Sequence, residues 1–414
     1  MASYVQKLTY SFSQFGISLL WQAFNTVAIF YYVTELHVSG EILSLGMMLF
    51  GVVSGFSNLI FGHLSDRANT RWGRRIPYLL FASLPFAVLF YLLFNPLVSH
   101  HYLLYFFWVT FLFDLAFTIT ALNFGALYPE MYPTDADRHN VSALLQLFSI
   151  LGAMVGVALA KPIGQTWGWG AMGLMFSITG AFSLYASLFG VHENPLYPKE
   201  HFYLKESLIK TVKNRNFLIY ILVNLLIQLV TNLFVMLSSF YTKYAVPLSA
   251  GQSSMFLGAL FLVTIPMSFV WAKVSVHKNT ARTVMLSAVL YGLCALLFLV
   301  DNGPVGVILT GALLGIPVAG FFVQLNVMLA QIIEFDASQT GLRREGMYLG
   351  VNGFIVRLGM SLQFVMLTFY FSVSHFTSLR ANQPVSAISD LRMMMGGLPV
   401  LLLSFAIWLL TKLK

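Results

Sequence analysis

The stretch GHLSDRANTRWGRR, from Gly62 to Arg75, holds four arginines and one aspartate between two almost wholly apolar runs. The run SLGMMLFGVVSGFSNLIF, residues 44–61, comes before it, and IPYLLFASLPFAVLFYLLF, residues 76–94, comes after it. Apolar runs of about 20 residues are long enough to cross a bilayer as helices, and short connections rich in arginine stay on the cytoplasmic side. The stretch therefore predicts two membrane-spanning helices joined by a cytoplasmic turn.

The composition extends this prediction to the whole chain of 414 residues, of which 58% are hydrophobic and only 9% are charged. Soluble domains have about 25% charged residues, so this chain has too few charges to cover a water-soluble surface. A net charge of +8 would suit nucleic acid only if the bases shared one face, but they lie in short turns between apolar runs. We therefore expect a polytopic protein of the lipid bilayer that binds no nucleic acid.

The sequence lacks the motifs of covalent and metal chemistry. It has no HExxH, no Walker phosphate loop and no Cys–His metal spacing, and the single Cys294 cannot form an intrachain disulfide. We expect no enzymatic activity, no cofactor and no metal site.

Apolar runs recur along the chain and predict twelve membrane-spanning helices in an all-α protein. The predicted spans lie near residues 10–34, 41–64, 77–96, 103–129, 141–162, 169–191, 216–241, 250–273, 281–300, 304–333, 346–374 and 392–411. Most of the 23 lysines and arginines fall in connections on the same side as both chain ends, while Lys161 and Arg392 are among the few assigned to the other side. By the positive-inside rule we expect a multi-pass protein of the cell (inner) membrane with both termini cytoplasmic.

A long polar stretch divides the chain into two groups of six spans. We predict an N-terminal six-helix half over 1–191, a cytoplasmic linker over 192–215 and a C-terminal six-helix half over 216–414. The halves resemble each other at one turn, because PEMYPTDADRHNVS after the fourth span and IEFDASQTGLRREG after the tenth both place acids before arginine. Two pseudo-symmetric halves are the organisation of many secondary transporters.

Acids and bases at these cytoplasmic turns suit a gate that opens and closes during transport. The residues predicted to form the gate are Asp66, Arg67, Arg71, Arg75, Glu130, Arg138, Glu334, Arg343 and Arg344. The alternative is that they are solvated helix ends, since surface ion pairs contribute little free energy. Their recurrence at matching positions in the two halves favours the gate.

Two motifs carry a resemblance to a known family. Residues 62–67 (Gly-His-Leu-Ser-Asp-Arg) followed by 71–75 (Arg-Trp-Gly-Arg-Arg) resemble the signature between the second and third helices of the major facilitator superfamily. Together with residues 336–348 of the eleventh-helix region, the chain is similar to the glycoside–pentoside–hexuronide:cation symporter family, to which the melibiose carrier belongs. The resemblance covers both halves and implies the major facilitator fold, alternating access, and a sugar or glycoside carried with a cation. It also implies that Asp66 is a conformational latch.

The chain departs from this family at the positions that would bind the cation and the sugar. Alignment on the shared motifs places Ser18, Ser54, Asn58 and Ala121 at the family's intramembrane carboxylates, Gln146 at its sugar-contacting arginine and Arg357 at a lysine of the eleventh helix. Neutral oxygens bind hard cations less tightly than carboxylates do. We therefore expect a proton, or no coupling ion, in preference to sodium.

Two charges lie deep in predicted spans, Asp114 in the fourth and Arg357 in the eleventh. Intramembrane charges are costly and indicate function, so we predict that they pair in some conformation or meet water or ligand. The alternatives are a structural carboxyl at Asp114 and fixed bonds to carbonyls or hydroxyls at Arg357. Gly346, Gly350 and Gly353 precede Arg357 at helical spacing, which predicts close approach of another helix.

Uncharged polar side chains repeat along the spans and predict a cavity for a hydroxylated ligand. The predicted cavity residues are Gln14, Ser18, Trp21, Gln22, Asn25, Asn58, Gln146, Gln228, Asn232 and Gln324. Amides form paired bonds with hydroxyls, and an indole can stack on a sugar ring. The alternative is polar packing between helices, which is common in membranes.

These observations predict a monomeric secondary active transporter that moves a small solute, by family default a sugar or glycoside, by alternating access. A co-transported proton is expected before sodium. The alternatives are a transporter or flippase of an amphipathic, lipid-like ligand such as a lysolipid, and an uncoupled facilitator. A non-transporting assembly factor or sensor would need a filled cavity or a large soluble domain, and the sequence has no such domain.

Overall fold

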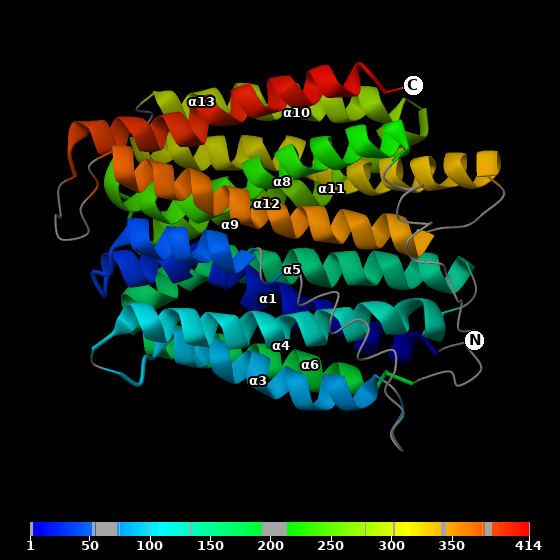
Figure 1. Ribbon diagram of the computed structural model, residues 1–414, viewed down its shortest axis with the longest axis horizontal. Coiled ribbons are helices and arrows are strands. Elements are labelled where there is room, and N and C mark those ends of the chain that lie inside the picture. Colours follow the sequence, from blue (N-terminus) through cyan, green and yellow to red (C-terminus); the bar gives the residue numbers. More distant parts are fainter. Residues whose placement is uncertain are drawn as a thin grey trace. The chain divides into compact units, whose positions relative to one another are not determined.

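The computed structural model describes residues 3–51, 54, 73, 75–98, 100–132, 135–192, 213–277, 279–300, 303–340, 345–374, 376 and 383–413. Within these residues, eleven helices are long and apolar enough to cross a membrane, and a shorter apolar helix covers Gly40–Gly51. A bilayer core offers no water to backbone groups, so a spanning segment must bond its own N–H and C=O groups as a helix does. The helices of each half run along roughly a common direction (Figure 1).

The described helices of the N-terminal half are α1 (Tyr4–Thr34), the Gly40–Gly51 helix, α3 (Ile76–Phe94), α4 (Tyr102–Met131), α5 (Asp135–Trp167) and α6 (Trp169–Leu188). The start of α1 is fixed by a capping box, in which the Ser3 hydroxyl accepts from the Gln6 amide and the Gln6 side chain accepts from the Ser3 amide. Such a box satisfies two backbone donors that a helix otherwise leaves unpaired. At α3, Pro77 stands in the first turn, where its missing N–H is not needed.

The described helices of the C-terminal half are α8 (Arg215–Phe240), the π-helical turn η1 (Tyr241–Ala245), α9 (Ala250–His277), α10 (Thr280–Leu296), the 3-10 turn η2 (Leu297–Leu299), α11 (Gly303–Thr340), α12 (Glu345–Val373) and α13 (Val385–Leu410). Asn214 and Asn279 cap α8 and α10 by accepting hydrogen bonds from backbone amides. The chain separates into compact units at Lys199/Glu200, inside the segment 192–215 that we predict as the linker.

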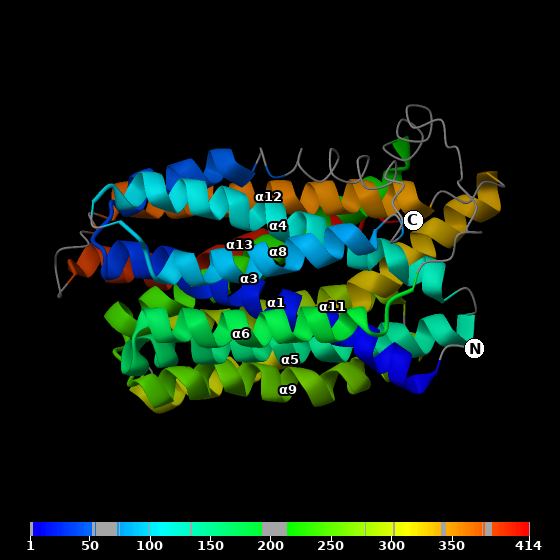
Figure 2. The same cartoon turned by 90° about the horizontal axis from the view of Figure 1, so that it is seen from below.

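Glycines bring α5 close to α1 in the N-terminal half. A Cβ at Gly152 would strike the Phe15 carbonyl oxygen, and one at Gly156 would strike the Leu19 carbonyl oxygen. Small residues at such contacts let membrane helices approach until their backbones touch. Helix α1 also packs on α6, and α6 lies beside α5 (Figure 2).

The C-terminal half uses the same device between α9 and α11. A Cβ at Gly311 would strike the Phe256 carbonyl oxygen, and one at Gly315 would strike the Leu260 carbonyl oxygen. Helix α13 packs on α8 and α10, and α12 packs on α8. Each half therefore has its own tightly packed helix pair.

The predicted ends of two spans were wrong, and both errors concern a base. Helix α5 continues through Pro162 to Trp167, so Lys161 lies inside the helix with 1% exposure rather than in an outer connection. Membrane helices tolerate proline where neighbouring groups satisfy the freed carbonyl. Helix α13 begins at Val385, which places Arg392 inside it as well.

Candidate functional site

The polar residues predicted on the first span form a partly exposed stripe along α1. Helix α1 is mostly buried, but its predicted cavity residues keep intermediate exposure: Gln14, Ser18, Trp21, Gln22 and Asn25. Their spacing of three and four residues places them on one helical face. Faces turned to lipid are apolar, because polar groups in hydrocarbon cost free energy. The stripe is therefore suited to a hydrated cavity.

Two hydrogen bonds fix parts of this stripe. The Ser18 and Ser149 hydroxyls lie 2.9 Å apart and join α1 to α5. The Asn25 side-chain amide donates to the Trp21 carbonyl at 3.0 Å. Ser18 is thus partly engaged in helix packing, the alternative considered for all these residues, while Asn25 keeps its amide oxygen available as an acceptor.

Asp114 lies near the middle of α4 and is only 3% exposed. One helical turn away on either side stand Thr110 and Thr118, which are also buried. Asp114 is twelve residues from the start of α4, about 18 Å at 1.5 Å per residue. Asp114 therefore lies near the middle of a helix that is long and apolar enough to span the bilayer.

Ring contacts between α1 and α4 set the height of Asp114 relative to the stripe. Their centroid separations are 4.6 Å for Tyr32–Phe106, 5.1 Å for Phe24–Phe113, 4.0 Å for Trp21–Phe117 and 6.3 Å for Tyr10–Phe124. The residue numbers fall on α1 as they rise on α4, so the helices are antiparallel. Asp114 therefore lies at the height of Phe24 and Asn25, at the end of the polar stripe nearer the C-terminus of α1.

The other N-terminal cavity residues are placed less completely. Gln146 is exposed on α5, one turn before Ser149. Ser54 is buried, with 6% exposure. Asn58 lies outside the described residues, so the structure does not place it.

In the C-terminal half, α8 carries a stripe like that of α1. Gln228 and Asn232 have intermediate exposure on an otherwise mostly buried helix. One turn from Gln228, Asn224 is 4% exposed and donates to the Asn352 side chain of α12 at 2.8 Å. The α8 stripe thus combines polar helix packing at Asn224 with partly exposed amides beyond it.

Gln324, predicted as a cavity residue, is fully buried within the C-terminal half. Its side-chain oxygen accepts from the Thr283 hydroxyl at 3.0 Å, and its nitrogen donates to the Trp271 carbonyl at 3.3 Å. Both ends of the amide are therefore used to join α11 to α10 and α9. This environment is that of polar helix packing, not of a ligand contact.

Arg357 lies near the middle of α12 with intermediate exposure. The predicted close approach at Gly350 and Gly353 was wrong, because a Cβ at either would meet nothing within 4 Å. The close contact occurs at Gly359 instead, where a Cβ would lie 2.7 Å from Leu225 of α8. Arg357 therefore lies between a stretch of α12 in which Gly350 and Gly353 have no close neighbour and a stretch that packs on α8 at Gly359.

The predicted gate falls largely outside the description. Asp66, Arg67, Arg71, Arg343 and Arg344 lie outside the described residues. For two further members, Glu130 and Arg138, the helix is described but the side chain is not. Of the rest, Arg75 precedes α3 with 8% exposure, and Glu334 is exposed on α11.

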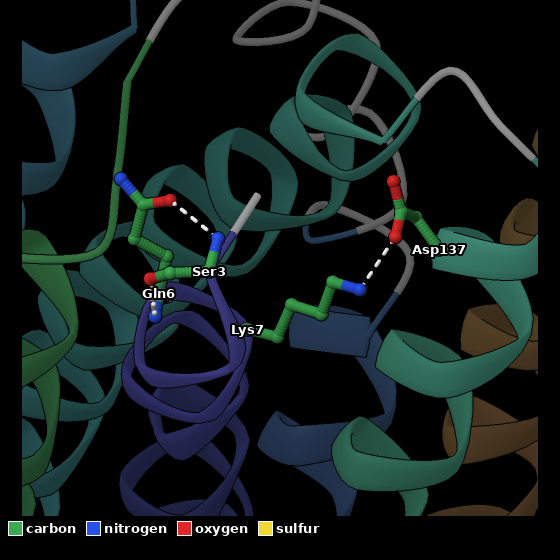
Figure 3. Close-up of polar contacts among 4 residues, drawn as sticks. All are labelled: Ser3, Gln6, Lys7 and Asp137. Carbon is green, nitrogen blue, oxygen red and sulfur yellow. Dashed lines mark hydrogen bonds and ion pairs between the residues drawn. The ribbon is translucent and has the colours of Figure 1, made fainter. Parts of the chain in front are cut away.

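An ion pair that the sequence did not reveal joins the first turns of α1 and α5. The Lys7 ammonium lies 2.5 Å from an Asp137 carboxylate oxygen, and both side chains are 12% exposed (Figure 3). The Tyr132 ring contacts the Tyr10 ring edge-on at 5.5 Å. Burial raises the pKa of the Tyr132 hydroxyl, and the negative charge of Asp137 raises it further. Asp137 therefore lies in a tightly packed cluster rather than at a freely solvated end.

The C-terminal half has a corresponding contact. Asn214, the cap of α8, donates from its side chain to the Tyr348 hydroxyl of α12 at 3.0 Å. The Tyr348 ring also meets the Phe217 ring edge-on at 4.5 Å. In each half, the start of the first helix is thus tied to the start of the fifth.

Removing one partner of the Lys7–Asp137 pair is expected to destabilise the protein. Lys7→Met or Asp137→Asn should each cost about 1–2 kcal/mol, between the values for exposed and buried pairs. The measurement is the unfolding midpoint of the purified protein in detergent. The exchanged variant, Lys7→Asp with Asp137→Lys, should recover part of the loss. Single variants with wild-type midpoints would show that the contact contributes no net stability.

Lys161 is a second feature that sequence reasoning missed. Its ammonium lies 4.9 Å from the centre of the Phe30 ring, and the side chain is 1% exposed in a helix that can span the membrane. A cation over an aromatic face is stabilised, more so when water is excluded. Arg357 is therefore not the one base deep in the described spans. The sequence held a signal for this position of Lys161, since no polar residue lies between Lys161 and Gln165 to mark the end of the helix.

Comparison with solved structures assigns the fold. The chain resembles a bacterial homolog of the human lysosomal transporter Spinster, with a TM-score of 0.70 at 12% identity, over 99% of this chain and 96% of that chain. Together with the helical halves, this likeness assigns the major facilitator fold, as predicted, and the described residues hold eleven helices long enough to cross a membrane and one shorter apolar helix.

The family follows from the sequence match. Residues 9–414 match the family described as MFS/sugar transport protein, and the chain belongs to this family. It is 23% identical to the isoprimeverose transporter of Lactiplantibacillus pentosus over 87% of this chain and 78% of the relative. It is 22% identical to the lactose permease of Lactobacillus delbrueckii subsp. bulgaricus over 99% of this chain and 70% of the relative. The protein is thus an integral, multi-pass secondary transporter of the sugar and glycoside class.

Proposed function

We propose that the protein moves a small saccharide or glycoside together with a proton by alternating access. The observation that carries the proposal is the buried Asp114 carboxyl at the height of a polar, aromatic stripe on α1. An intramembrane carboxyl is costly and indicates a function, and a carboxyl can bind and release a proton. Amides and an indole on the same wall suit the hydroxyls and the apolar face of a sugar.

The relatives support the substrate class. Their names specify isoprimeverose and lactose, both small saccharides. The polar stripes on α1 and α8 have the same character, since neither presents a charged side chain among its partly exposed amides. A neutral hydroxylated ligand therefore fits these stripes better than an ion does.

Arg357 completes the proposed coupling device. It lies near the middle of its helix in the C-terminal half, as Asp114 does in the N-terminal half. We infer that the two charges neutralise each other in one conformation and separate in another. The gate residues predicted on the cytoplasmic side, among them Asp66 and Arg75, would then bias which conformation prevails. Cytoplasmic termini and a monomeric state belong to the same proposal.

Sodium is expected to have little effect on ligand affinity. Of the four positions where the family places carboxylates, Ser18, Ser54 and Ala121 are described and none carries a charge. The dissociation constant for lactose or isoprimeverose should change by less than about twofold when sodium chloride replaces choline chloride at constant ionic strength. Isothermal titration at fixed pH measures this. A steep sodium dependence would show that neutral oxygens suffice for a sodium site.

A second candidate function is transport of a lipid-like ligand. The observation in its favour is a groove of about 830 Å³ between α3 and α4, lined almost wholly by apolar side chains such as Phe81, Leu84 and Leu112. An acyl chain would fit such a groove, but so would ordinary membrane lipid. Specific saturable binding of a lysophospholipid, with no saccharide binding, would favour this candidate.

A further inference from the structure

A polar pocket of about 300 Å³ lies at one end of the C-terminal half, lined by residues of α8, α10, α11 and the chain after α13. Helix α8 begins at Arg215 and α10 at Thr280, while α13 ends at Leu410. Each of these helices can span a membrane, so the pocket lies where they leave the hydrocarbon and enter the headgroup region. It is separate from the α8 polar stripe, because Gln228 is twelve residues, about 18 Å, along the helix from the lining residue Asn216.

Two kinds of side chain line this pocket. Neutral hydrogen-bonding groups come from Asn216, Asn279, Thr280 and Gln331, and apolar groups come from Ala281, Met328, Ile332, Phe335 and Leu413. Met328 is 2% exposed, whereas Phe335 is 56% exposed, so the apolar lining runs from the protein interior to the outer surface of α11. The pocket is therefore suited to a ligand that has a polar head and an apolar part.

Thr280 brings a buried hydroxyl to the wall of the pocket. The residue is 5% exposed, and its hydroxyl oxygen has no hydrogen-bond partner among the described residues. Its carbonyl, in contrast, accepts from the Thr283 hydroxyl at 2.7 Å. Buried hydroxyls are nearly always hydrogen-bonded, because an unsatisfied one costs free energy. A ligand with a hydrogen-bond acceptor would supply the bond that Thr280 lacks.

The start of α10 favours a negatively charged acceptor. The Asn279 side-chain oxygen accepts from the backbone amides of Ala281 at 2.9 Å and Arg282 at 3.4 Å. This cap uses the oxygen of the Asn279 amide and not its nitrogen. The first turn of a helix is the positive end of its dipole, which stabilises an anion placed beside it.

Bases outnumber acids beside the lining residues. In the sequence, five bases and two acids directly adjoin a lining residue, namely Arg215, Lys278, Arg282, Lys412 and Lys414 against Glu334 and Asp336. Arg215, Arg282 and Lys412 are described and exposed. Of the acids, Glu334 is exposed and Asp336 is only 8% exposed. The surroundings of the pocket are thus positively charged on balance.

Trp408 and Lys412 mark the depth of the pocket in the membrane. Trp408 is 53% exposed on α13, and the Lys412 ammonium lies 5.5 Å from the centre of its ring. Tryptophan side chains gather at the boundary between hydrocarbon and water, and lysines there extend toward the headgroups. Leu413 therefore lies at a level that a membrane lipid reaches from the side.

We propose that this pocket binds the headgroup of an anionic glycerophospholipid that carries hydroxyl groups, of the phosphatidylglycerol type. The Thr280 hydroxyl donates to a phosphate oxygen, and the amides of Asn279 and Gln331 bond the headgroup hydroxyls. Phe335 and Leu413 contact the first part of the acyl chains. Basic pockets between helices at the cytoplasmic surface are suited to anionic lipids, and a lipid bound here links α8, α10, α11 and the chain after α13.

The experiment measures the unfolding midpoint of the full-length protein in dodecyl maltoside micelles with increasing mole fractions of dioleoylphosphatidylglycerol. The midpoint of wild type should rise and saturate, because the lipid binds the folded state. Dioleoylphosphatidylcholine should give no such rise, and neither should millimolar sn-glycerol 1-phosphate, which has no acyl chains. The readout is lipid binding, so it does not depend on which solute the protein transports.

Two substitutions test the residues of the pocket. Thr280→Val should raise the half-saturating mole fraction about tenfold, through loss of a hydrogen bond to a charged group. Thr280→Ser keeps the hydroxyl and should bind as wild type does. Arg282→Gln should raise the half-saturating fraction about fivefold, the contribution of one base near an anionic surface.

Each substitution has a matched control outside the pocket. Thr120 of α4 is 0% exposed, and its hydroxyl also has no partner within the described part of the chain. Lys273 is an exposed base of α9 that adjoins no lining residue. Thr120→Val and Lys273→Gln should keep the half-saturating fraction of wild type, whatever they do to the midpoint without lipid.

Three results would overturn the proposal. Equal or unsaturated responses to the two phospholipids would show that no headgroup site exists. A wild-type half-saturating fraction in both Thr280→Val and Arg282→Gln would place lipid binding elsewhere on the protein. An equal, saturating rise with sn-glycerol 1-phosphate would make the pocket a site for a soluble phosphate ester and reject the lipid. If Thr280→Val does not fold, Arg282→Gln against Lys273→Gln decides the outcome.

Discussion

Asp114→Asn is expected to retain sugar exchange across the membrane but to lose accumulation driven by a pH gradient. Asparagine has nearly the shape of aspartate but cannot bind and release a proton, so exchange should stay within about threefold of wild type while accumulation falls to equilibrium. The basis is the 3% exposure of Asp114 near the middle of α4. A carboxyl buried within a membrane-spanning helix is costly and indicates a function, which we propose to be proton transfer.

The measurement uses proteoliposomes with an alkaline interior and labelled lactose or isoprimeverose outside. Wild type should accumulate label above the external concentration, and Asp114→Asn should stop at equality. Glu41→Gln is the matched control, because Glu41 is an exposed carboxylate near the start of the Gly40–Gly51 helix. Undiminished accumulation by Asp114→Asn would make Asp114 a structural carboxyl.

Arg357→Ala alone is expected to impair transport more than Arg357→Ala combined with Asp114→Asn. The single variant leaves Asp114 without its proposed counter-charge, and an uncompensated charge near mid-membrane costs about 3 kcal/mol on insertion scales. The double variant removes both charges and with them this cost. Exchange rates in the single variant should fall by a factor of ten or more, and each tenfold corresponds to about 1.4 kcal/mol of activation free energy. The double variant should recover part of this loss.

Exchange rates normalised to the amount of folded protein test this expectation in a double-mutant cycle. Lys161 supplies a comparison, since it is also a buried base in a membrane-spanning helix but lies beside Phe30. Lys161→Met combined with Asp114→Asn should show no such recovery. Additive losses for Arg357→Ala and Asp114→Asn would mean that the two charges act independently.

The spans were predictable because a helix that crosses a bilayer needs about 20 consecutive apolar residues, and such a run can be recognised from the local sequence alone. Asp114 was predictable for the same reason, since a lone carboxylate within an apolar run is visible without knowledge of its neighbours. The polar stripe from Gln14 to Asn25 also followed from helical spacing alone. These features need only one helix and its period.

Features that depend on which helices become neighbours were not predictable. Gln324 and Gln228 are both uncharged polar residues within apolar runs, yet the two ends of the Gln324 side-chain amide form hydrogen bonds that join three helices. Lys7 and Asp137 are 130 positions apart, and nothing local pairs them. Lys161 was assigned to an outer connection, whereas the helix that holds it, α5, continues past Pro162 to Trp167. The Gln324 and Lys7–Asp137 contacts are made by tertiary packing, which the local pattern of residues does not specify.

Counterflow in proteoliposomes tests the central claim most directly. Vesicles that contain purified protein and a high concentration of unlabelled lactose, isoprimeverose or methyl β-D-glucuronide are diluted into trace label of the same compound. The account predicts transient accumulation of label for at least one saccharide, faster than in empty vesicles and unaffected by replacing sodium with choline. No counterflow with any of the three, together with saturable lysophospholipid binding, would contradict it.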